Sequence, residues 1–152
     1  MKYLIDRASA ITPKDSLEDL LKSKKSLRIK LGVDPTAPDV TLGWYAILRA
    51  LRKFQDYGHT AVLILGEFTA QVGDPSGKSE TRTQLKENQI DDNSKGVLPI
   101  IKDILNKENL EIVSNKDWLS KLSTSELVHL SSSTTLAQML EREDFANRYK
   151  DG

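Results

Sequence analysis

The chain has 152 residues, and its 22 lysines and arginines balance its 22 aspartates and glutamates. It contains no cysteine and only two histidines, which excludes disulfides and thiolate metal sites and argues against a histidine-rich metal centre. The balanced charge leaves no global field that would attract nucleic acid or an anionic membrane. This length predicts one domain with a single modest core. Because the first residues lack an apolar segment of signal-peptide length and no later apolar run reaches transmembrane length, we expect a cytoplasmic protein without membrane contact.

The first half of the chain predicts a strand–helix–strand unit. After a short amphipathic helix over residues 17–23, residues 27–33 alternate as a strand does. A long helix then begins at Asp39 or Thr41 and ends near Tyr57, before Gly58. The apolar run of residues 60–66 is typical of a parallel strand that is buried on both faces. Both strands of such a unit end at the same edge of the sheet, where open α/β sheets bind their ligands.

The second half predicts one more helix and strand, followed by amphipathic segments. A helix is expected around residues 95–107, with Pro99 near its first turn, and a short strand over residues 110–113. Three amphipathic segments then cover residues 117–122, 125–130 and 136–149. We therefore expect a partial Rossmann-like nucleotide- and amino-acid-binding domain over residues 1–114 and the start of a helical connective region over residues 115–152.

Two polar loops follow the first two strands and should face each other. The second loop, Gly-Asp-Pro-Ser-Gly-Lys-Ser over residues 73–79, lacks the spacing of a phosphate-binding P-loop, because valine occupies position 72. As a bare pattern it is more typical of a glycine-rich turn. Asp74, at the mouth of a buried strand, is well placed to hold a ligand ammonium group. In the first loop, Asp34 and Asp39 are also compatible with a role as simple turn formers.

Several stretches together closely resemble the N-terminal catalytic region of bacterial tyrosyl-tRNA synthetases. They are Leu-Gly-Val-Asp-Pro-Thr-Ala-Pro-Asp at residues 31–39, residues 51–59, Phe-Thr-Ala-Gln-Val-Gly-Asp-Pro-Ser-Gly-Lys-Ser-Glu-Thr-Arg at residues 68–82, and the segments 115–119 and 139–149. The resemblance covers nearly the whole chain in the same order. It implies an α/β fold, namely the N-terminal half of a class I synthetase Rossmann fold, with a parallel sheet, flanking helices and a helical appendage.

The resemblance also implies a two-step reaction. Tyrosine attacks the α-phosphate of ATP, with Mg²⁺, to give tyrosyl-adenylate, and the acyl group then passes to tRNA(Tyr). ATP enters as a substrate, so no bound cofactor and no resident metal are implied. An active site of this kind acts mainly by positioning its substrates and by stabilising charge on the transferring phosphate.

The family's site residues can be placed on this sequence by the same resemblance. Asp74 would hold the tyrosine ammonium group, with Thr69 beside it, and Gly32 and Asp34 would line the substrate pocket. On the nucleotide side, Thr36 would meet the phosphates and Gly43 would allow the backbone to approach the adenine.

One departure from the family affects catalysis directly. The family's His-Ile-Gly-His signature reads Thr-Leu-Gly-Trp at residues 41–44. Thr41 keeps a hydroxyl donor but has no imidazole, and Trp44 is large enough to intrude where the nucleotide should lie. The loss of two such donors should cost several kcal/mol of transition-state stabilisation, by analogy with about 3 kcal/mol for one oxyanion donor.

The second departure is length. The chain stops at Gly152, before the family's second Rossmann half, its Lys-Met-Ser-Lys-Ser loop and its anticodon-binding region. The helical appendage, which makes the family's homodimer contact, is cut mid-course, and the sheet edge is left open to a partner. We therefore expect an N-terminal fragment or truncated gene product that binds tRNA weakly and is inactive alone.

Three hypotheses remain open for the present activity of the chain. The first is a tyrosyl-tRNA synthetase catalytic-domain fragment, which the overall match favours as a family assignment. The second is a non-catalytic module that binds tyrosine or docks onto another protein, which the missing histidines favour. The third is a split enzyme that another chain completes, which would explain the open edge but not Trp44.

Overall fold

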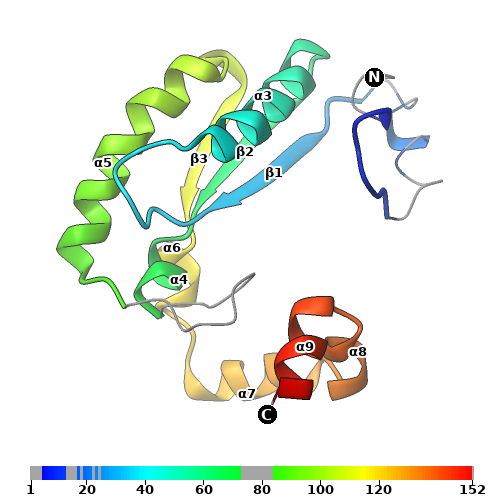
Figure 1. The fold of residues 1–152 in the computed structure, drawn as a ribbon, viewed down its shortest axis with the longest axis vertical. Helices are drawn as coiled ribbons and strands as arrows, with labels where there is room; N and C mark the ends of the chain where they lie inside the picture. The colour runs from blue at the N-terminus through cyan, green and yellow to red at the C-terminus, as the bar shows by residue number, and fades with distance from the viewer. Residues whose placement is uncertain are drawn as a thin grey trace.

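The computed structural model describes residues 5–12, 17, 19–21, 23, 25–72 and 84–151 of the chain. Its sheet of described residues has three parallel strands in the order β1-β2-β3, which are β1 (Arg28–Val33), β2 (Thr60–Leu65) and β3 (Leu110–Ser114). The helices are α3 (Leu42–Asp56), α4 (Glu67–Val72), α5 (Glu87–Ile104), the 3-10 turn η1 (Lys107–Asn109), α6 (Lys116–Leu119), α7 (Thr124–Ser132), α8 (Leu136–Leu140) and α9 (Glu143–Asp151). Because the strands are parallel, their carboxyl ends meet at one edge, beside α4 and α6 (Figure 1).

The predicted strand–helix–strand unit and the third strand are confirmed, but the helix between β2 and β3 was placed wrongly. α5 begins at Glu87 and not near residue 95, so Pro99 lies inside the helix and not in its first turn. The first turns of α5 carry mostly polar residues because this part of the helix faces solvent, and only Ile90 and Ser94 of it are buried. The polar stretch therefore showed no apolar face that could predict a helix. Of the short helix predicted over residues 17–23, the described residues 17 and 19–21 are helical.

The core lies between one face of the sheet and the helices α3 and α5. Alternate residues of β2 point to this face, and Leu63 of β2 is fully buried against Leu48 of α3 and Ile101 of α5. The complete cluster consists of Leu48, Leu51, Ala61, Leu63, Leu65, Val97, Ile101 and Leu105. Burial of one such side chain contributes about 1.5–3 kcal/mol, so this cluster is what holds the two helices on the sheet.

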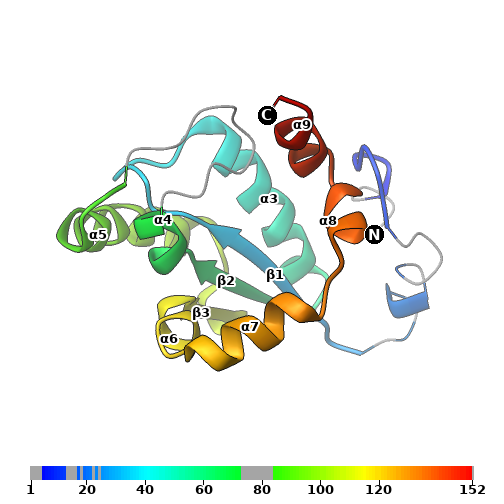
Figure 2. The same cartoon turned by 90° about the horizontal axis from the view of Figure 1, so that it is seen from below.

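The opposite face of the sheet is more polar. β1 turns its odd-numbered apolar residues to the core and exposes Arg28, Lys30 and Gly32 on the other side. Arg28 pairs with the carboxylate of Glu111 on β3 across the middle strand, but both side chains are largely exposed, so the ion pair contributes little to stability. α6 and α7 lie on this side of the sheet, whereas α3 lies on the other (Figure 2).

The amino ends of the strands are joined by polar side chains that bond to the backbone. The Gln55 amide, which is almost fully buried, donates to the carbonyl oxygens of Asn106 and Asn109, both at 2.9 Å, and accepts from Asn106 N–H at 2.8 Å. The buried His59 accepts from Leu27 N–H through Nδ1 at 3.3 Å, and its carbonyl accepts from the Asn109 amide at 2.8 Å. These bonds fix the end of the sheet that lies away from the strand carboxyl termini.

The helices after β3 bury little apolar surface within the described chain. Leu127, Val128 and Leu130 of α7 and Leu136 of α8 are each more than half exposed. The guanidinium groups of Arg142, just before α9, and of Arg148, within it, each lie over the Phe145 ring at 4.7 Å from its centroid. Within the described ranges, no helix has both the length and the apolar composition needed to cross a bilayer.

α5 also holds the loop that follows β1. Asn93 donates from its side-chain amide to the Pro35 carbonyl at 3.0 Å, and one turn later Gly96 lies directly against Pro38. A Cβ atom on Gly96 would lie 2.7 Å from the Pro38 carbonyl oxygen, closer than atoms can normally approach. Only a residue without a side chain therefore lets α5 and this loop pack together.

We expect Gly96→Ala to lower the free energy of unfolding by about 1–2 kcal/mol, because the overpacking penalty exceeds the gain in helix propensity. The matched control is Gly43→Ala in the first turn of α3, where an added Cβ would meet only Thr41 Oγ1 at 3.7 Å. This control should be neutral or stabilising by up to about 1 kcal/mol. Urea denaturation measures both variants, and equal stability of the two would contradict the contact at Pro38.

Candidate functional site

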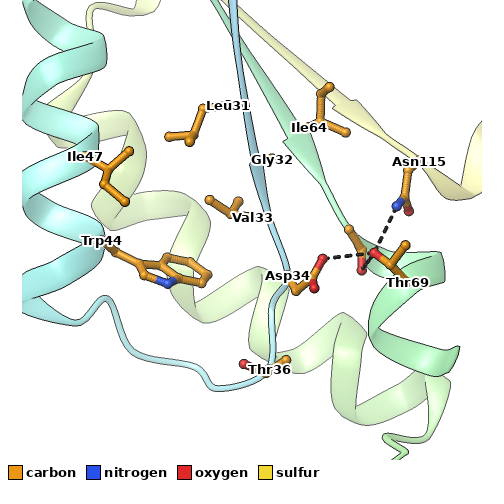
Figure 3. A pocket seen from close by; sticks show the side chains of 11 residues that line it. Leu31, Gly32, Val33, Asp34, Thr36, Trp44, Ile47, Ile64, Thr69 and Asn115 are labelled. Carbon is orange, nitrogen blue, oxygen red and sulfur yellow. Dashed lines mark hydrogen bonds between the residues drawn. The ribbon is translucent and has the colours of Figure 1, made fainter. Parts of the chain in front are cut away.

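A cavity of about 450 Å³ lies at the carboxyl edge of the sheet, in the size range of sites for small ligands. Eleven residues line it: Leu31, Gly32, Val33, Asp34, Thr36, Trp44, Ile47, Ile64, Gly66, Thr69 and Asn115. The cavity extends to both sides of the open edge of β1 (Figure 3). Apolar side chains of β1 and α3 form one side, and the polar ends of the strands together with Ile64 of β2 form the other.

The polar side is a chain of hydrogen bonds that joins the ends of all three strands. The Thr69 hydroxyl, in α4 just after β2, donates to Asp34 Oδ1 at 2.9 Å, and Asp34 directly follows β1. The Asn115 amide, directly after β3, donates from Nδ2 to Thr69 Oγ1 at 3.0 Å. Parallel strands bring these three residues to one edge although the sequence separates Asp34 from Asn115 by 81 positions. Figure 3 shows the three side chains linked in this order.

Two glycines shape the cavity in different ways. Gly66 directly follows β2 and leaves room for the carboxylate of Asp34, which follows β1, because a Cβ there would lie 1.8 Å from Asp34 Oδ1 and 2.7 Å from Thr69 Oγ1. Gly32 faces open space, and a Cβ there would meet nothing within 4 Å. Gly66 is therefore required by the protein's own packing, whereas Gly32 leaves an open wall to which a ligand can come close.

The apolar side contains a large aromatic residue of α3. Trp44 packs on the edge of the core cluster and also lines the cavity with Ile47, Leu31 and Val33. In Figure 3 the indole lies on the α3 side of β1, across the strand from Thr69. The indole therefore forms part of the wall on this side of the cavity.

Thr41 has a structural task at the start of α3. It is the N-cap residue, and its hydroxyl oxygen accepts from Trp44 N–H at 3.3 Å. This bond satisfies one of the helix's free N–H groups. Neither Thr41 nor Gly43, which lies in the first turn of α3, lines the cavity.

Hydrogen bonds and an ion pair connect α4, α5 and the end of β3 around the cavity. The Glu67 carboxylate at the start of α4 accepts from the hydroxyls of Ser94 on α5 and Ser114 on β3. Lys116, next to Asn115, pairs with Glu87 at the start of α5. The hydrogen bond from Lys116, and secondarily the positive charge of Lys116, lowers the pKa of Glu87 below its ordinary value. The same hydrogen bond, and secondarily the negative charge of Glu87, raises the pKa of Lys116. These contacts tie α5, α4 and β3 together behind the polar chain.

The structure brings together five of the residues that the sequence marked as site residues. Gly32, Asp34, Thr36, Thr69 and Trp44 all line the cavity. Asp74 lies outside the described residues. No group of three or more histidine, aspartate or glutamate residues that could hold a metal ion occurs in the part of the chain that the structure describes.

Sequence reasoning gave no role to Gly66 or Asn115. Gly66 is the last residue of the predicted strand 60–66, and Asn115 lies two residues after the predicted strand 110–113. A place at the end of a strand is the available signal for residues at the ligand edge of a parallel sheet. Asn115 is only 7% exposed, so its side chain is an integral part of the site and not a surface group.

Comparison with known proteins decides the family. The chain matches the family model of class I tRNA synthetases (W and Y) over residues 22–152. The chain belongs to this family. It is 46% identical to the tyrosine–tRNA ligase of Thermotoga maritima over 152 residues, and 46% identical to that of Chlorobaculum tepidum over 154 residues. The alignments cover 100% and 99% of this chain but 38% of each relative. The chain thus corresponds to a catalytic-domain portion of a tyrosyl-tRNA synthetase and spans about two fifths of the relatives' length.

Solved synthetase structures share the fold. A C-terminally truncated mitochondrial tyrosyl-tRNA synthetase of Aspergillus nidulans superposes with a TM-score of 0.72 at 23% identity, covering 90% of this chain and 42% of that one. The tyrosyl-tRNA synthetase of Archaeoglobus fulgidus complexed with L-tyrosine gives a TM-score of 0.69 at 18% identity, covering 88% and 40%. The predicted fold class, the N-terminal half of a class I synthetase Rossmann fold, is therefore confirmed.

The two glycines of the cavity should respond differently to alanine. Gly66→Ala should lower the free energy of unfolding by about 1–3 kcal/mol, because the new methyl group must displace the Asp34 carboxylate and break its bond to Thr69. Gly32→Ala should change it by less than about 0.5 kcal/mol, because the added Cβ meets open space. Urea denaturation measures both values, and a Gly32→Ala variant as unstable as Gly66→Ala would show that the cavity wall is closed in solution.

Proposed function

We propose that this chain binds tyrosine as the amino-acid half of a tyrosyl-tRNA synthetase site. The observation that supports the proposal is the cavity, in which the oxygens of Asp34 and Thr69 lie beside the open wall at Gly32. In the proposed complex these oxygens and the carboxylate of Asp74 receive the ammonium group. The apolar side chains on the other side of β1 enclose the aromatic ring.

We also propose how this half-site relates to the whole enzyme. Residues 1–114 form the partial nucleotide- and amino-acid-binding domain, and residues 115–152 begin the helical connective region. In the complete synthetase, tyrosine and ATP with Mg²⁺ give tyrosyl-adenylate, which then charges tRNA(Tyr). β1 is an edge strand of the described sheet, so a further segment or a second chain can pair with it and complete the site.

Calorimetric titration of the chain with tyrosine tests the binding proposal. We expect saturable binding, and at least a tenfold loss of affinity, about 1.4 kcal/mol, in Gly32→Ala, whose methyl group fills the space that the ligand needs. Asp74→Ala should lose as much, because one carboxylate that holds the ammonium is removed. Lys107→Ala serves as the control, since Lys107 is 70% exposed in the turn before β3. Unchanged affinity in both Gly32→Ala and Asp74→Ala would place tyrosine elsewhere.

We propose that the chain alone does not activate tyrosine. The Thr41 hydroxyl oxygen already accepts from Trp44 N–H in the first turn of α3, and the Trp44 indole lines the cavity. Neither side chain supplies the imidazole that the family's signature provides. These two positions also favour the alternative function, a non-catalytic module that binds tyrosine or another protein.

Titration with ATP, together with an assay of pyrophosphate exchange, distinguishes an active enzyme from a non-catalytic binding module. We expect neither ATP binding nor exchange in the wild-type chain. Trp44→Ala should gain ATP binding, because removal of the indole enlarges the cavity, but it should not gain exchange. Exchange by the wild-type chain would show that Trp44 is no obstacle and that the chain is a working enzyme.

A further inference from the structure

A second cavity, of about 640 Å³, lies between the N-terminal segment and the side of α3 that faces away from the core. Its size is typical of sites for small molecules. Ile47 is the one described residue that lines both this cavity and the one at the carboxyl edge of the sheet, so the two are separate sites. The described residues of its lining are Ile5, Arg7, Ala8, Ala10, Ile11, Thr12, Leu17, Leu21, Ala46, Ile47, Arg49, Ala50, Lys53 and Phe54.

Short apolar side chains form the α3 side of this cavity. Ala46 and Ala50 lie one helical turn apart, opposite to Leu48 and Leu51, which are buried in the core. A methyl group at each of these two positions leaves space above the helix. The N-terminal segment contributes apolar side chains that are only half-buried, namely Ile5, Ile11, Leu17 and Leu21. The cavity is therefore bounded by aliphatic groups that the packing of the described chain leaves partly uncovered.

The charged side chains around this cavity are all positive. Arg49 and Lys53 lie four residues apart on α3, so they share one face of the helix, and both line the cavity. Arg7 lines it as well, but the two cations of α3 are enough to hold one carboxylate. No aspartate or glutamate occurs among the described residues of the lining. A negatively charged group is therefore favoured at this rim.

Arg49 is the cation that is most available to a ligand. Lys53 already donates to Asp56 at 3.3 Å, which leaves the other donors of its ammonium. Arg49 is exposed and forms no ion pair or hydrogen bond with its side chain among the described residues. It also borders a smaller groove with Asp56 and Asp103, but these carboxylates pair with Arg52, Lys53 and Lys107 instead. The planar guanidinium matches the two oxygens of a carboxylate.

We infer that the second cavity binds an alkyl carboxylate of medium chain length, with the carboxylate at Arg49 and Lys53 and the chain over the two alanines of α3. Among the described residues of the lining, Thr12 is the one neutral polar side chain. A ligand body with several polar groups would therefore bury them without hydrogen-bond partners, and an alkyl chain has none to bury. This site goes beyond the proposed function, because it shares neither the ligand nor the polar residues of the tyrosine cavity.

Calorimetric titration of the chain with octanoate, decanoate and dodecanoate, each below the concentration at which it forms micelles, tests the inference. We expect one ligand per chain and about a tenfold gain in affinity for each added pair of methylene groups, until the alkyl chain fills the cavity. Decan-1-ol has the same chain length without the charge, and it should bind about three- to fivefold more weakly than decanoate. Uptake of several ligands per chain, or no saturable binding, would overturn the inference. Binding to phosphatidylglycerol vesicles without binding of free decanoate would also overturn it, because it would indicate a contact with a membrane surface.

Two variants locate the head and the chain of the ligand. Arg49→Met keeps an apolar stem and removes the charge, so the preference for decanoate over decan-1-ol should fall below about twofold. Lys102→Met is the matched control, since Lys102 is an exposed cation of α5 that lines neither cavity. Ala46→Leu should weaken both ligands about tenfold, because the larger side chain fills the space over α3, and leucine is a good helix former at this exposed position. Equal affinity for decanoate in all three variants would contradict the proposed site.

Methyl NMR of the wild-type chain locates the ligand without any substitution. Decanoate should shift the methyl resonances of Ala46, Ala50 and Ile11, which line the second cavity. The resonances of Ile64, which lines the tyrosine cavity and not this one, should stay in place. Shifts at Ile64 without shifts at Ala50 would place the ligand in the other cavity and overturn the inference. Because tyrosine is absent from this experiment, its outcome is independent of whether the proposed function holds.

Discussion

The hydrogen bonds between Asp34, Thr69 and Asn115 join the side chains at three strand ends, alongside the last backbone bonds of the sheet, which run from Gly66 N–H to the Val33 carbonyl and from Asn115 N–H to the Leu65 carbonyl. Within a parallel sheet, strand-to-strand bonds end where the strands end, and the polar groups beyond must find partners or water. Here the side chain of Asn115, after β3, bonds to that of Thr69, in the helix after β2, and Thr69 bonds to Asp34, after β1. The carboxyl edge is therefore ordered by side chains, and the shape of the cavity depends on them.

The opposite end of the sheet is built differently. There the buried side chain of Gln55 and the partly buried side chain of Asn109 bond to backbone carbonyls. A backbone partner is the same for every sequence, so this end is fixed independently of which residues occupy the neighbouring positions. At the carboxyl edge, side chains bond to side chains. A substitution there changes which donors and acceptors face the cavity.

The sequence predicted the strands and α3 because their apolar residues recur with clear periods. It failed for the first turns of α5, where a solvent-facing helix of polar residues carries no such period. Of the residues that line the cavity, Asp34 and Thr69 were predicted as site residues through the motifs that contain them. The role of Asn115 was not, because its importance lies in a hydrogen bond to a residue 46 positions away, which only the folded chain reveals.

The residue at position 44 contributes to folding as well as to the cavity. The tryptophan there packs against the core cluster as well as lining the site, and the hydroxyl of Thr41 caps the same helix. Histidine at these two positions would remove apolar contacts and a helix cap together, so each substitution is opposed by folding. A variant that carries imidazoles at the start of α3 therefore needs compensating changes elsewhere in the core.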